Sequence, residues 1–457
     1  MDRFTLEKLI NLYKENKASV SEVVEDCLKS IDEKDSEINC FWHVDKEQAI
    51  HRAKELDKQA SQFSAQLPLF GVPVAYKDLF ETAGIKTTAG SSFLKNYVPE
   101  QNAFVVDLFQ QAGVVSLGKV AMHEWAMGCI GDNAFYGACG NPHDPDYICG
   151  GSSSGSAAAV AAGLCFLSLG TDTGGSIRIP AACCGVVGIK PSNGLISNRG
   201  VIPLSWNLDH VGPLANNVFD IAMALNVLSI HDPLDPYSKK ISGEDYTKDI
   251  RAGVKGWKIA LAGGNYFNDS EVVAEETIHA IKRAAKAYES LGAIVEIVDC
   301  ESLKEARELS RQHLAADALA FHHDRINTDP TGFGEDVLSR LINDPPKTVT
   351  DYANLKHRQM ILKREYDSLL EKYDCLILPT TPFAAVDRNE VEELAKARKN
   401  LTRFTAPFNF LDLPAISIPC GFNYEGMFIG LQIVSARYQE SKILRAAYAF
   451  EETYVDY

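Results

Sequence analysis

Two glycine- and serine-rich turns, joined by an apolar, alanine-rich stretch, lie between residues 150 and 191. Glycine lets backbone approach a reacting group closely, and adjacent backbone N–H groups in such a turn can converge on a developing negative charge. In the second turn, Thr173, Gly174, Gly175 and Ser176 would supply these donors as an oxyanion hole. Because the Ser176 hydroxyl follows the two glycines directly, we predict that Ser176 is a catalytic nucleophile.

A serine hydroxyl is a weak nucleophile at neutral pH and needs a base within hydrogen-bond reach. No histidine lies inside the two turns, and the nearest, His143 and His210, stand in sequences that are typical of turns. Lys77 instead ends an apolar, strand-like run over residues 72–76. Burial at a strand end disfavours the charged amine, and a neutral lysine can take the place of histidine. We therefore predict that Lys77 is the base.

These residues and their surroundings resemble the amidase signature family. Lys77, Ser152 and Ser176 fall on the lysine, the bridging serine and the nucleophilic serine of that family, with separations of 75 and 24 residues that agree with its spacing. The flanking stretches GVPVAYKD, LGKVAMHEWAMG, GVVGIKPSNGLIS, SWNLDHVGPLA and LPTTPF agree as well. The resemblance covers about residues 5–445 and is weakest over about 235–370.

The resemblance implies a mechanism for this chain. Neutral Lys77 would take a proton from Ser152, Ser152 would take one from Ser176, and Ser176 would attack an amide carbonyl to form an acyl-enzyme. It also implies a cis peptide bond before Ser152, and it places Met127 and Gly128 at the acyl pocket. It implies no cofactor and no metal ion.

Other interpretations of the same residues remain open. A GGSSSGS stretch can be a flexible linker, but here an apolar, helix-like run follows at once. A glycine-rich turn before a helix can bind phosphate, yet neither G-x-x-x-x-G-K-[ST] nor a strand-linked G-x-G-x-x-G is present. Cys129, Cys139 and Cys149 recur at ten-residue steps, which admits a metal site, although paired zinc spacings are absent. Asp172 and Arg178, on opposite sides of Ser176, are expected to form a buried ion pair.

Composition limits the partners and the compartment. A net charge of −16 without a Lys/Arg run argues against nucleic-acid binding. No stretch reaches the roughly 18–20 apolar residues that a membrane span requires, and we expect the alanine-rich run over 157–169 to be a buried helix. The eleven scattered cysteines, with no C-x-x-C, favour a reducing compartment. We expect a cytoplasmic protein that takes a small-molecule amide substrate, and the sequence leaves a homodimer open.

The order of expected elements predicts the fold. Helical periodicity over about residues 1–60 gives way to alternating strands and helices, which predicts an α/β fold with a large mixed central β-sheet covered by helices on both faces. Residues 257–299 read as a β-α-β unit, 301–372 as mostly helical, and three further strands follow. We expect one amidase domain over residues 1–457, with an N-terminal helical layer over about 1–60 and a more variable segment over about 235–370.

Three functions remain. The main hypothesis is a stand-alone amide hydrolase. The alternative is the A subunit of a tRNA-dependent amidotransferase, which hydrolyses glutamine to supply ammonia. Against it, Ile179 stands where glutamine is expected, and residues 305–325 lack the expected tyrosine- and arginine-rich sequence. A non-enzymatic scaffold would be favoured by the loss of a catalytic residue, and Lys77, Ser152 and Ser176 are all present.

Overall fold

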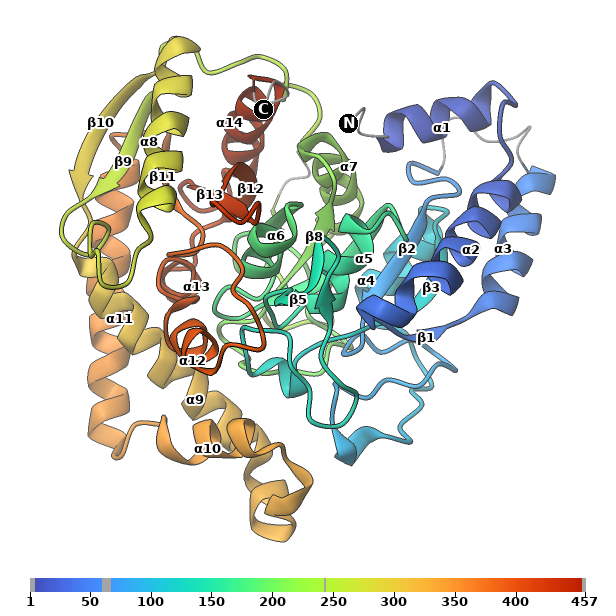
Figure 1. The fold of residues 1–457 in the computed structure, drawn as a ribbon, viewed down its shortest axis with the longest axis horizontal. Helices are drawn as coiled ribbons and strands as arrows, with labels where there is room; N and C mark the ends of the chain where they lie inside the picture. The colour runs from blue at the N-terminus through green and yellow to red at the C-terminus, as the bar shows by residue number, and fades with distance from the viewer. Residues whose placement is uncertain (1–4, 60–66, 242–243, 454–457) are drawn as a thin grey trace.

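The computed structural model of the chain describes residues 5–59, 67–241 and 244–453. Parts of the expected N-terminal layer, residues 1–4 and 60, lie outside this range. The described residues form a mixed α/β structure around one 11-stranded sheet, with helices on both faces (Figure 1). The fold class predicted from the sequence is therefore confirmed.

The large sheet draws its strands from almost the whole chain. Its order is β1-β3-β2-β6-β8-β7-β12-β13-β11-β9-β10. The strands are β1 (Phe41–Val44), β2 (Pro73–Lys77), β3 (Val115–Val120), β6 (Leu167–Asp172), β7 (Val187–Lys190), β8 (His210–Ala215), β9 (Lys258–Gly263), β10 (Ile294–Asp299), β11 (Cys375–Pro379), β12 (Ala415–Phe422) and β13 (Phe428–Val434). A separate two-stranded hairpin consists of β4 (Gly140–Asn141) and β5 (Asp144–Ile148).

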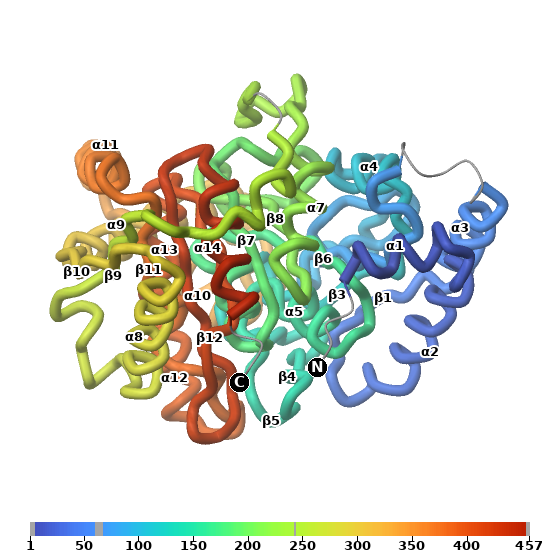
Figure 2. Tube along the Cα trace, turned by 90° about the horizontal axis from the view of Figure 1, so that it is seen from above, coloured from blue at the N-terminus to red at the C-terminus, as the bar shows by residue number. Residues whose placement is uncertain are grey.

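The α-helices pack around the large sheet along its whole length. At one end of the molecule, α1–α3 flank β1–β3, while β9, β10 and α11 lie at the other end (Figure 2). The described helices are α1 (Leu6–Lys14), α2 (Val20–Ile38), α3 (Lys46–Gln59), α4 (Phe104–Gln111), α5 (Ser154–Ala161), α6 (Arg178–Cys184), α7 (Val218–Leu228), α8 (Glu275–Ser290), α9 (Ser302–Thr328), α10 (Glu335–Asn343), α11 (Val349–Leu370), α12 (Val391–Asn400), α13 (Ala406–Phe410) and α14 (Glu440–Thr453).

Strand direction decides which strand ends meet on the side of the sheet where Lys77 lies. β2 runs parallel to β6, whereas β8 is antiparallel to β6 and β7 is antiparallel to β8. β12 is antiparallel to β7, so it also runs opposite to β2 and β6. The carboxyl ends of β2, β6 and β7 therefore share one edge with the amino ends of β8 and β12, and the carboxyl end of β12 lies at the opposite edge.

Two expected elements differ from the structure. The run over 157–169 is not one helix, because α5 ends at Ala161 and Gly163, at φ +70°, turns the chain toward β6. Both segments are buried and apolar, so hydrophobicity alone did not separate helix from strand. The N-terminal layer also contains a strand: β1 pairs antiparallel with β3 at the edge of the sheet. The β-α-β unit is confirmed as β9–α8–β10, with β10 parallel to β9.

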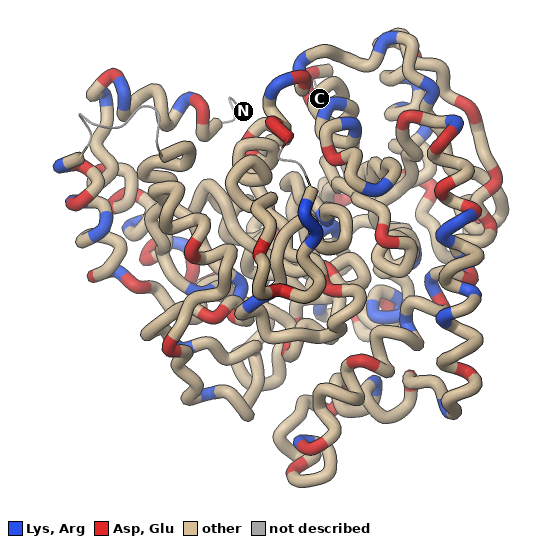
Figure 3. The backbone as a smooth tube through the Cα atoms, turned by 180° about the vertical axis from the view of Figure 1, so that it is seen from behind, with Lys and Arg blue, Asp and Glu red and all other residues tan. Residues whose placement is uncertain are grey.

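Charged residues occur mainly on the outer elements. Figure 3 shows Lys and Arg mixed with Asp and Glu along the peripheral helices, while the central elements carry few of either. Among residues 5–59, 67–241 and 244–453, no helix combines the length and the apolar character that crossing a membrane requires.

Candidate active site

Lys77 is the last residue of β2, in the interior of the sheet between β3 and β6. Its side chain is fully buried, and its Nζ lies 2.7 Å from Ser152 Oγ and 2.8 Å from Thr171 Oγ1. Burial lowers the pKa of Lys77 to about 7, although the negative charges of Asp209 and Asp172 act in the opposite direction. A substantial fraction of this amine is therefore neutral near pH 7, as a base requires.

Ser152 lies in the first turn, immediately before α5. The Gly151–Ser152 peptide bond is cis, as the resemblance implied. The carbonyl oxygen of Ser152 accepts a hydrogen bond from the backbone N–H of His123 at 3.1 Å, and the neighbouring Ser153 N–H donates to Ser176 O at 3.1 Å. These contacts hold the first turn between the segment after β3 and the second turn.

The next two serines, Ser153 and Ser154, hold the first turn to neighbouring segments. Ser153 Oγ donates to Thr171 O at 3.1 Å and accepts from Thr171 N–H at 3.2 Å. Ser154 Oγ donates to Ala121 O at 3.4 Å. Both hydroxyls therefore bond the backbone of other segments, namely β6 and the segment after β3.

Ser176 is the more accessible of the two predicted catalytic serines. Its exposed fraction is 7%, whereas Ser152 is sealed at 0%. Among the described residues, hydrogen bonds join Lys77 to Ser152 and the backbone of Ser153 to that of Ser176, but none joins the two serine hydroxyls. The structure thus brings Lys77 and Ser152 into direct contact and places Ser176 beside them through the backbone.

The Asp172 carboxylate accepts backbone hydrogen bonds from the second turn. Its Oδ1 accepts the Gly175 N–H at 2.8 Å, and its Oδ2 accepts the Ile177 N–H at 3.2 Å. Burial alone would raise the pKa of this carboxyl, but the charge and hydrogen bonds of Arg178 hold the pKa well below its usual range. Asp172 is therefore a permanent anion that anchors the loop carrying Ser176.

Arg178 completes the expected buried ion pair with Asp172. Its Nε and Nη2 donate to the two carboxylate oxygens at 2.9 and 2.8 Å, and both side chains are fully buried. The remaining donors reach Thr405 O at 3.0 Å, Gln432 Oε1 at 2.6 Å and Asn409 Oδ1 at 2.7 Å. The guanidinium thus links the second turn to α13 and β13.

The four predicted oxyanion donors differ in their hydrogen bonds. The Gly175 N–H is already engaged by Asp172 Oδ1, so it cannot point at a substrate oxygen in this conformation. Within the described residues, the backbone N–H groups of Thr173, Gly174 and Ser176 donate to no protein acceptor. Of the four predicted oxyanion donors, these three are therefore free of protein acceptors in this structure.

Gly175 instead shapes the turn. It adopts φ +133°, and a Cβ at this position would lie 2.2 Å from Thr405 Oγ1 and 2.7 Å from Ile179 Cδ1. The Thr405 hydroxyl donates to the neighbouring carbonyl of Gly174 at 2.8 Å. Only glycine fits here, because both the backbone conformation and the space exclude a side chain.

Asp209 is a buried carboxylate that the sequence analysis did not single out. Its Oδ1 accepts the Thr173 hydroxyl at 2.6 Å, and its Oδ2 accepts the backbone N–H groups of Leu204 and Ser205 at 2.9 and 3.1 Å. Burial raises the pKa of Asp209 to about 6, against the effect of these hydrogen bonds. Asp209 therefore supports the second turn and places a negative charge near Lys77.

Met127 and Gly128, the predicted acyl-pocket residues, lie against the first turn. A Cβ on Gly151 would approach Gly128 O to 3.2 Å, and a Cβ on Gly128 would lie 2.2 Å from the His123 ring. Met127 is 4% exposed, and its carbonyl accepts a hydrogen bond from Arg340 of α10 at 3.3 Å. The pair is thus close to Ser152, with Gly128 the more accessible of the two.

His143 and His210, the histidines nearest to the two turns in the sequence, lie in different kinds of element. His143 lies in the turn of the β4–β5 hairpin, as expected. His210 is not in a turn: it is the first residue of β8, it is buried, and burial lowers its pKa well below the ordinary value. In the described part of the chain, no three His, Cys, Asp or Glu side chains gather closely enough to hold a metal ion.

Comparison with known proteins identifies the class of this fold and site. The sequence model of the Amidase family matches residues 22–444. The chain belongs to the amidase family, and it is a hydrolase that acts on amide C–N bonds. A relative from Oceanobacillus iheyensis, the A subunit of a glutamyl-tRNA(Gln) amidotransferase, is 36% identical over 98% of this chain and 96% of its own length.

Solved structures give the same family. The structure of a vestigial protein complex, which reveals the evolutionary origins of an s-triazine catabolic enzyme, contains a chain with a TM-score of 0.93 and 31% identity, with 98% of both chains covered. The A subunit of the Thermotoga maritima glutamyl-tRNA(Gln) amidotransferase has a TM-score of 0.82 and 30% identity, covering 99% and 95%. The peptide amidase of Stenotrophomonas maltophilia has a TM-score of 0.85 and 26% identity, covering 99% and 97%.

Proposed function

We propose that this chain is a stand-alone amidase in which Ser176 forms the acyl-enzyme and Ser152 and Lys77 relay its proton. The observation that carries the proposal is the 2.7 Å contact between Ser152 Oγ and the buried Lys77 Nζ, whose pKa lies near 7. An amine in this state can accept a proton from Ser152 and return it within one catalytic cycle.

The reaction begins with two proton transfers. The Ser152 hydroxyl gives its proton to Lys77 Nζ, and Ser152 Oγ takes the proton of Ser176. The Ser176 oxygen then forms a bond to the amide carbonyl carbon, and the carbonyl π electrons move to the oxygen. Three backbone N–H groups, of Thr173, Gly174 and Ser176, would stabilise that oxyanion, since donors fixed before the reaction favour the transition state over the substrate.

Collapse of the tetrahedral intermediate completes acylation. The C–N bond breaks as the carbonyl re-forms, and the leaving nitrogen receives the proton that Lys77 returns through Ser152. Water then attacks the Ser176 ester, giving its proton to the same relay, and the carboxylic acid leaves. Ser176 is suited to meet substrate because it retains solvent access, while Ser152 and Lys77 are enclosed.

The alternative function is the glutamine-hydrolysing A subunit of an amidotransferase, and the 36% identity to such a protein favours it. Residue 179 favours the stand-alone function, because it is isoleucine where the amidotransferase subunit is expected to have glutamine. Ile179 is fully buried between the two turns, where its side chain would lie within about 3 Å of a Cβ on Gly150 or Gly175. This contact leaves the junction of the two turns apolar.

The test uses the purified chain alone. We expect it to hydrolyse simple aliphatic and aryl amides, with products quantified by chromatography, and to form hydroxamates when hydroxylamine competes with water. Glutaminase activity that appears only after partner chains and charged tRNA are added would support the amidotransferase alternative instead. The variant S176A, measured in parallel, controls for contaminating hydrolases.

We further propose that residues 1–457 form one amidase domain acting on a small-molecule amide in the cytoplasm, without nucleic acid. The 11-stranded sheet supports a single domain, because it joins strands from β1 to β13 across the chain. The cysteines support the cytoplasmic location, because all eleven are free thiols. This includes Cys139 and Cys149, whose Sγ atoms lie 3.6 Å apart. A homodimer remains an expectation that light scattering of the purified chain tests.

A further inference from the structure

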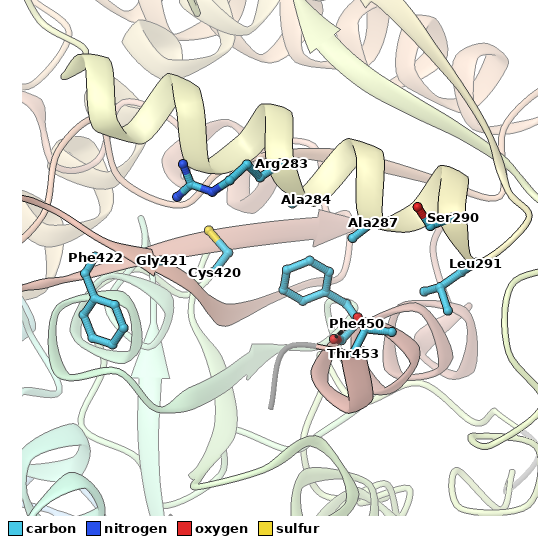
Figure 4. Close-up of a pocket in the computed structure, with 10 residues that line it drawn as sticks. All are labelled: Arg283, Ala284, Ala287, Ser290, Leu291, Cys420, Gly421, Phe422, Phe450 and Thr453. Carbon is cyan, nitrogen blue, oxygen red and sulfur yellow. Dashed lines mark hydrogen bonds between the residues drawn. The ribbon is translucent and has the colours of Figure 1, made fainter. Parts of the chain in front are cut away.

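A cavity of about 590 Å³ lies between α8, α14 and the carboxyl end of β12. We name it the α8–α14 cavity; the residues that define it here are Arg283, Ala284, Ala287, Leu291, Cys420 and Phe450. Its volume is typical of sites for small organic molecules, and its walls are mainly apolar, as such sites usually are. Figure 4 shows α8 along one side, the β12 strand opposite it, and the Phe450 ring between them.

The cavity is separate from the candidate active site. Lys77 and Asp172 stand at the carboxyl ends of β2 and β6, whereas Cys420 and Phe422 stand at the carboxyl end of β12. Because β12 runs opposite to β2 and β6, its carboxyl end lies at the other edge of the sheet. A ligand in the α8–α14 cavity therefore does not compete with substrate for the catalytic turns.

Among the described residues that line the cavity, Arg283 is the charged one, and none has an acidic side chain. Within the described residues, Arg283 forms no ion pair. Its side chain extends from α8 toward the end of the cavity where Cys420 and Phe422 lie, while Leu291 lies at the other end (Figure 4). The cavity thus has a positive end and an apolar body.

The two hydroxyl groups at the cavity do not offer their protons to a ligand. Ser290 Oγ donates to Lys286 O at 3.0 Å, and Thr453 Oγ1 donates to Phe450 O at 2.7 Å. Of the described lining side chains, the guanidinium of Arg283 is consequently the strong hydrogen-bond donor available to a ligand. A guanidinium with an open fork pairs best with a planar, anionic acceptor such as a carboxylate.

From this arrangement we propose that the α8–α14 cavity binds a small organic carboxylate, with its carboxylate on Arg283 and its apolar body against Ala287, Leu291 and Phe450. The apolar body gains by leaving water, and the charge pairing fixes its direction in the cavity. This binding site is additional to the proposed amidase site and does not depend on its activity.

Calorimetric titration with three probes of equal apolar body tests the charge requirement. Naphthalene-2-carboxylate is expected to bind with a Kd below about 1 mM, whereas the matching alcohol binds about tenfold more weakly and the matching ammonium compound not at all. Equal affinity for the alcohol and the carboxylate would contradict the role of Arg283 and overturn the proposal.

Three variants locate the binding site. R283Q is expected to weaken carboxylate binding about tenfold, and A287W, which fills the cavity, to abolish it. K282Q, a neighbouring exposed residue of α8 that does not line the cavity, should leave the affinity unchanged. Circular dichroism and thermal unfolding verify that R283Q and A287W remain folded, and R283Q changes an exposed side chain, so it should not disturb the core.

The same titrations distinguish other sites and occupants. A carboxylate is also the product of amide hydrolysis, so the probe could bind at the catalytic turns instead. Binding there would be unaffected by R283Q and A287W but lost in the active-site variants. This result would overturn the proposal. A chain that ends at Thr453 is titrated beside the full chain. Binding by the shortened chain alone would assign the cavity to the chain's own last four residues, and it would overturn the proposal as well.

Discussion

The hydroxyl of Thr173 donates a hydrogen bond to the buried carboxylate of Asp209 over 2.6 Å. This contact joins the proposed oxyanion turn to a group whose charge also acts on the proposed base, since Asp209 and Asp172 both raise the pKa of Lys77 against the effect of burial. One carboxylate thus influences both the geometry of the turn and the protonation of the relay.

Replacing Asp209 by asparagine should move the pH dependence of catalysis. Lys77 must be neutral to accept a proton, so wild-type kcat/KM should rise with pH through about 7, with activity at pH 6 about tenfold below that at pH 8. D209N removes a negative charge that favours the protonated amine, so the rising limb should shift to lower pH. The side-chain carbonyl of the new asparagine can still accept the Thr173 hydroxyl, which limits the loss of geometry.

The matched control for D209N is D220N. Asp220 is also a buried carboxyl, and burial raises its pKa to about 7, but it binds Leu6 N and Asn217 rather than the catalytic turn. D220N should leave the midpoint of the pH profile unchanged. A D209N profile that coincides with wild type would contradict the electrostatic role of Asp209.

The two glycines of the oxyanion turn should respond differently to alanine. G175A places a Cβ against Thr405 and Ile179 at a positive φ, so we expect the free energy of unfolding to fall by about 1–3 kcal/mol or more, with loss of activity. At Gly174 the nearest heavy atom to an added Cβ is Ala406 Cβ at 3.8 Å, so G174A should stay within about 0.5 kcal/mol of wild type. Urea unfolding measures both, and equal destabilisation would contradict the geometry of this turn.

Breaking the Asp172–Arg178 pair should be costly. R178M leaves a buried carboxylate without its partner, and removing one member of such a pair typically costs about 3–5 kcal/mol. The surface pair Arg398–Asp132 serves as control, because both side chains are about 40% exposed and R398M should change stability by less than about 1 kcal/mol. Chemical unfolding of both variants compares the two, and an R178M protein as stable as R398M would oppose the structural role assigned to the pair.

Asp317 of α9 should support the turn that carries Asp209. Its Oδ2 accepts the Ser205 hydroxyl at 2.6 Å and Asn207 Nδ2 at 3.0 Å. D317A leaves these two donors without their acceptor, so we expect a loss of about 1–3 kcal/mol in stability and a several-fold lower kcat. E308Q is the control on the same helix, because Glu308 pairs with Arg311 in an exposed position; steady-state kinetics and thermal unfolding compare the two variants.

Local sequence signals predicted much of this fold. The β9–α8–β10 unit and the strands β2, β3, β11, β12 and β13 follow from apolar runs bounded by turn residues. By contrast, β6 was merged with α5 because both are buried on all sides, so neither shows the periodicity that separates strand from helix. β7 and β8 were missed for a related reason, since their glycine and proline residues resemble a loop.

The site was only partly predictable. Lys77 could be found because a charged residue ended an apolar run, and Ser176 because it followed two glycines. Asp209 and Thr405 gave no comparable signal, since their importance comes from contacts with residues 36 and 231 positions away along the chain. The sequence likewise gives no sign that the Gly175 N–H donates to the Asp172 carboxylate, because that contact depends on how the turn folds.

The most direct test of the account is the identity of the acylated residue. Wild-type enzyme mixed with an activated aryl amide or ester and quenched in acid should carry one acyl group, located by peptide mass spectrometry on Ser176, and S176A should carry none. Hydroxylamine added before the quench should remove the adduct as the hydroxamate. An adduct on another residue, or undiminished acylation and turnover in S176A, would contradict the proposed mechanism.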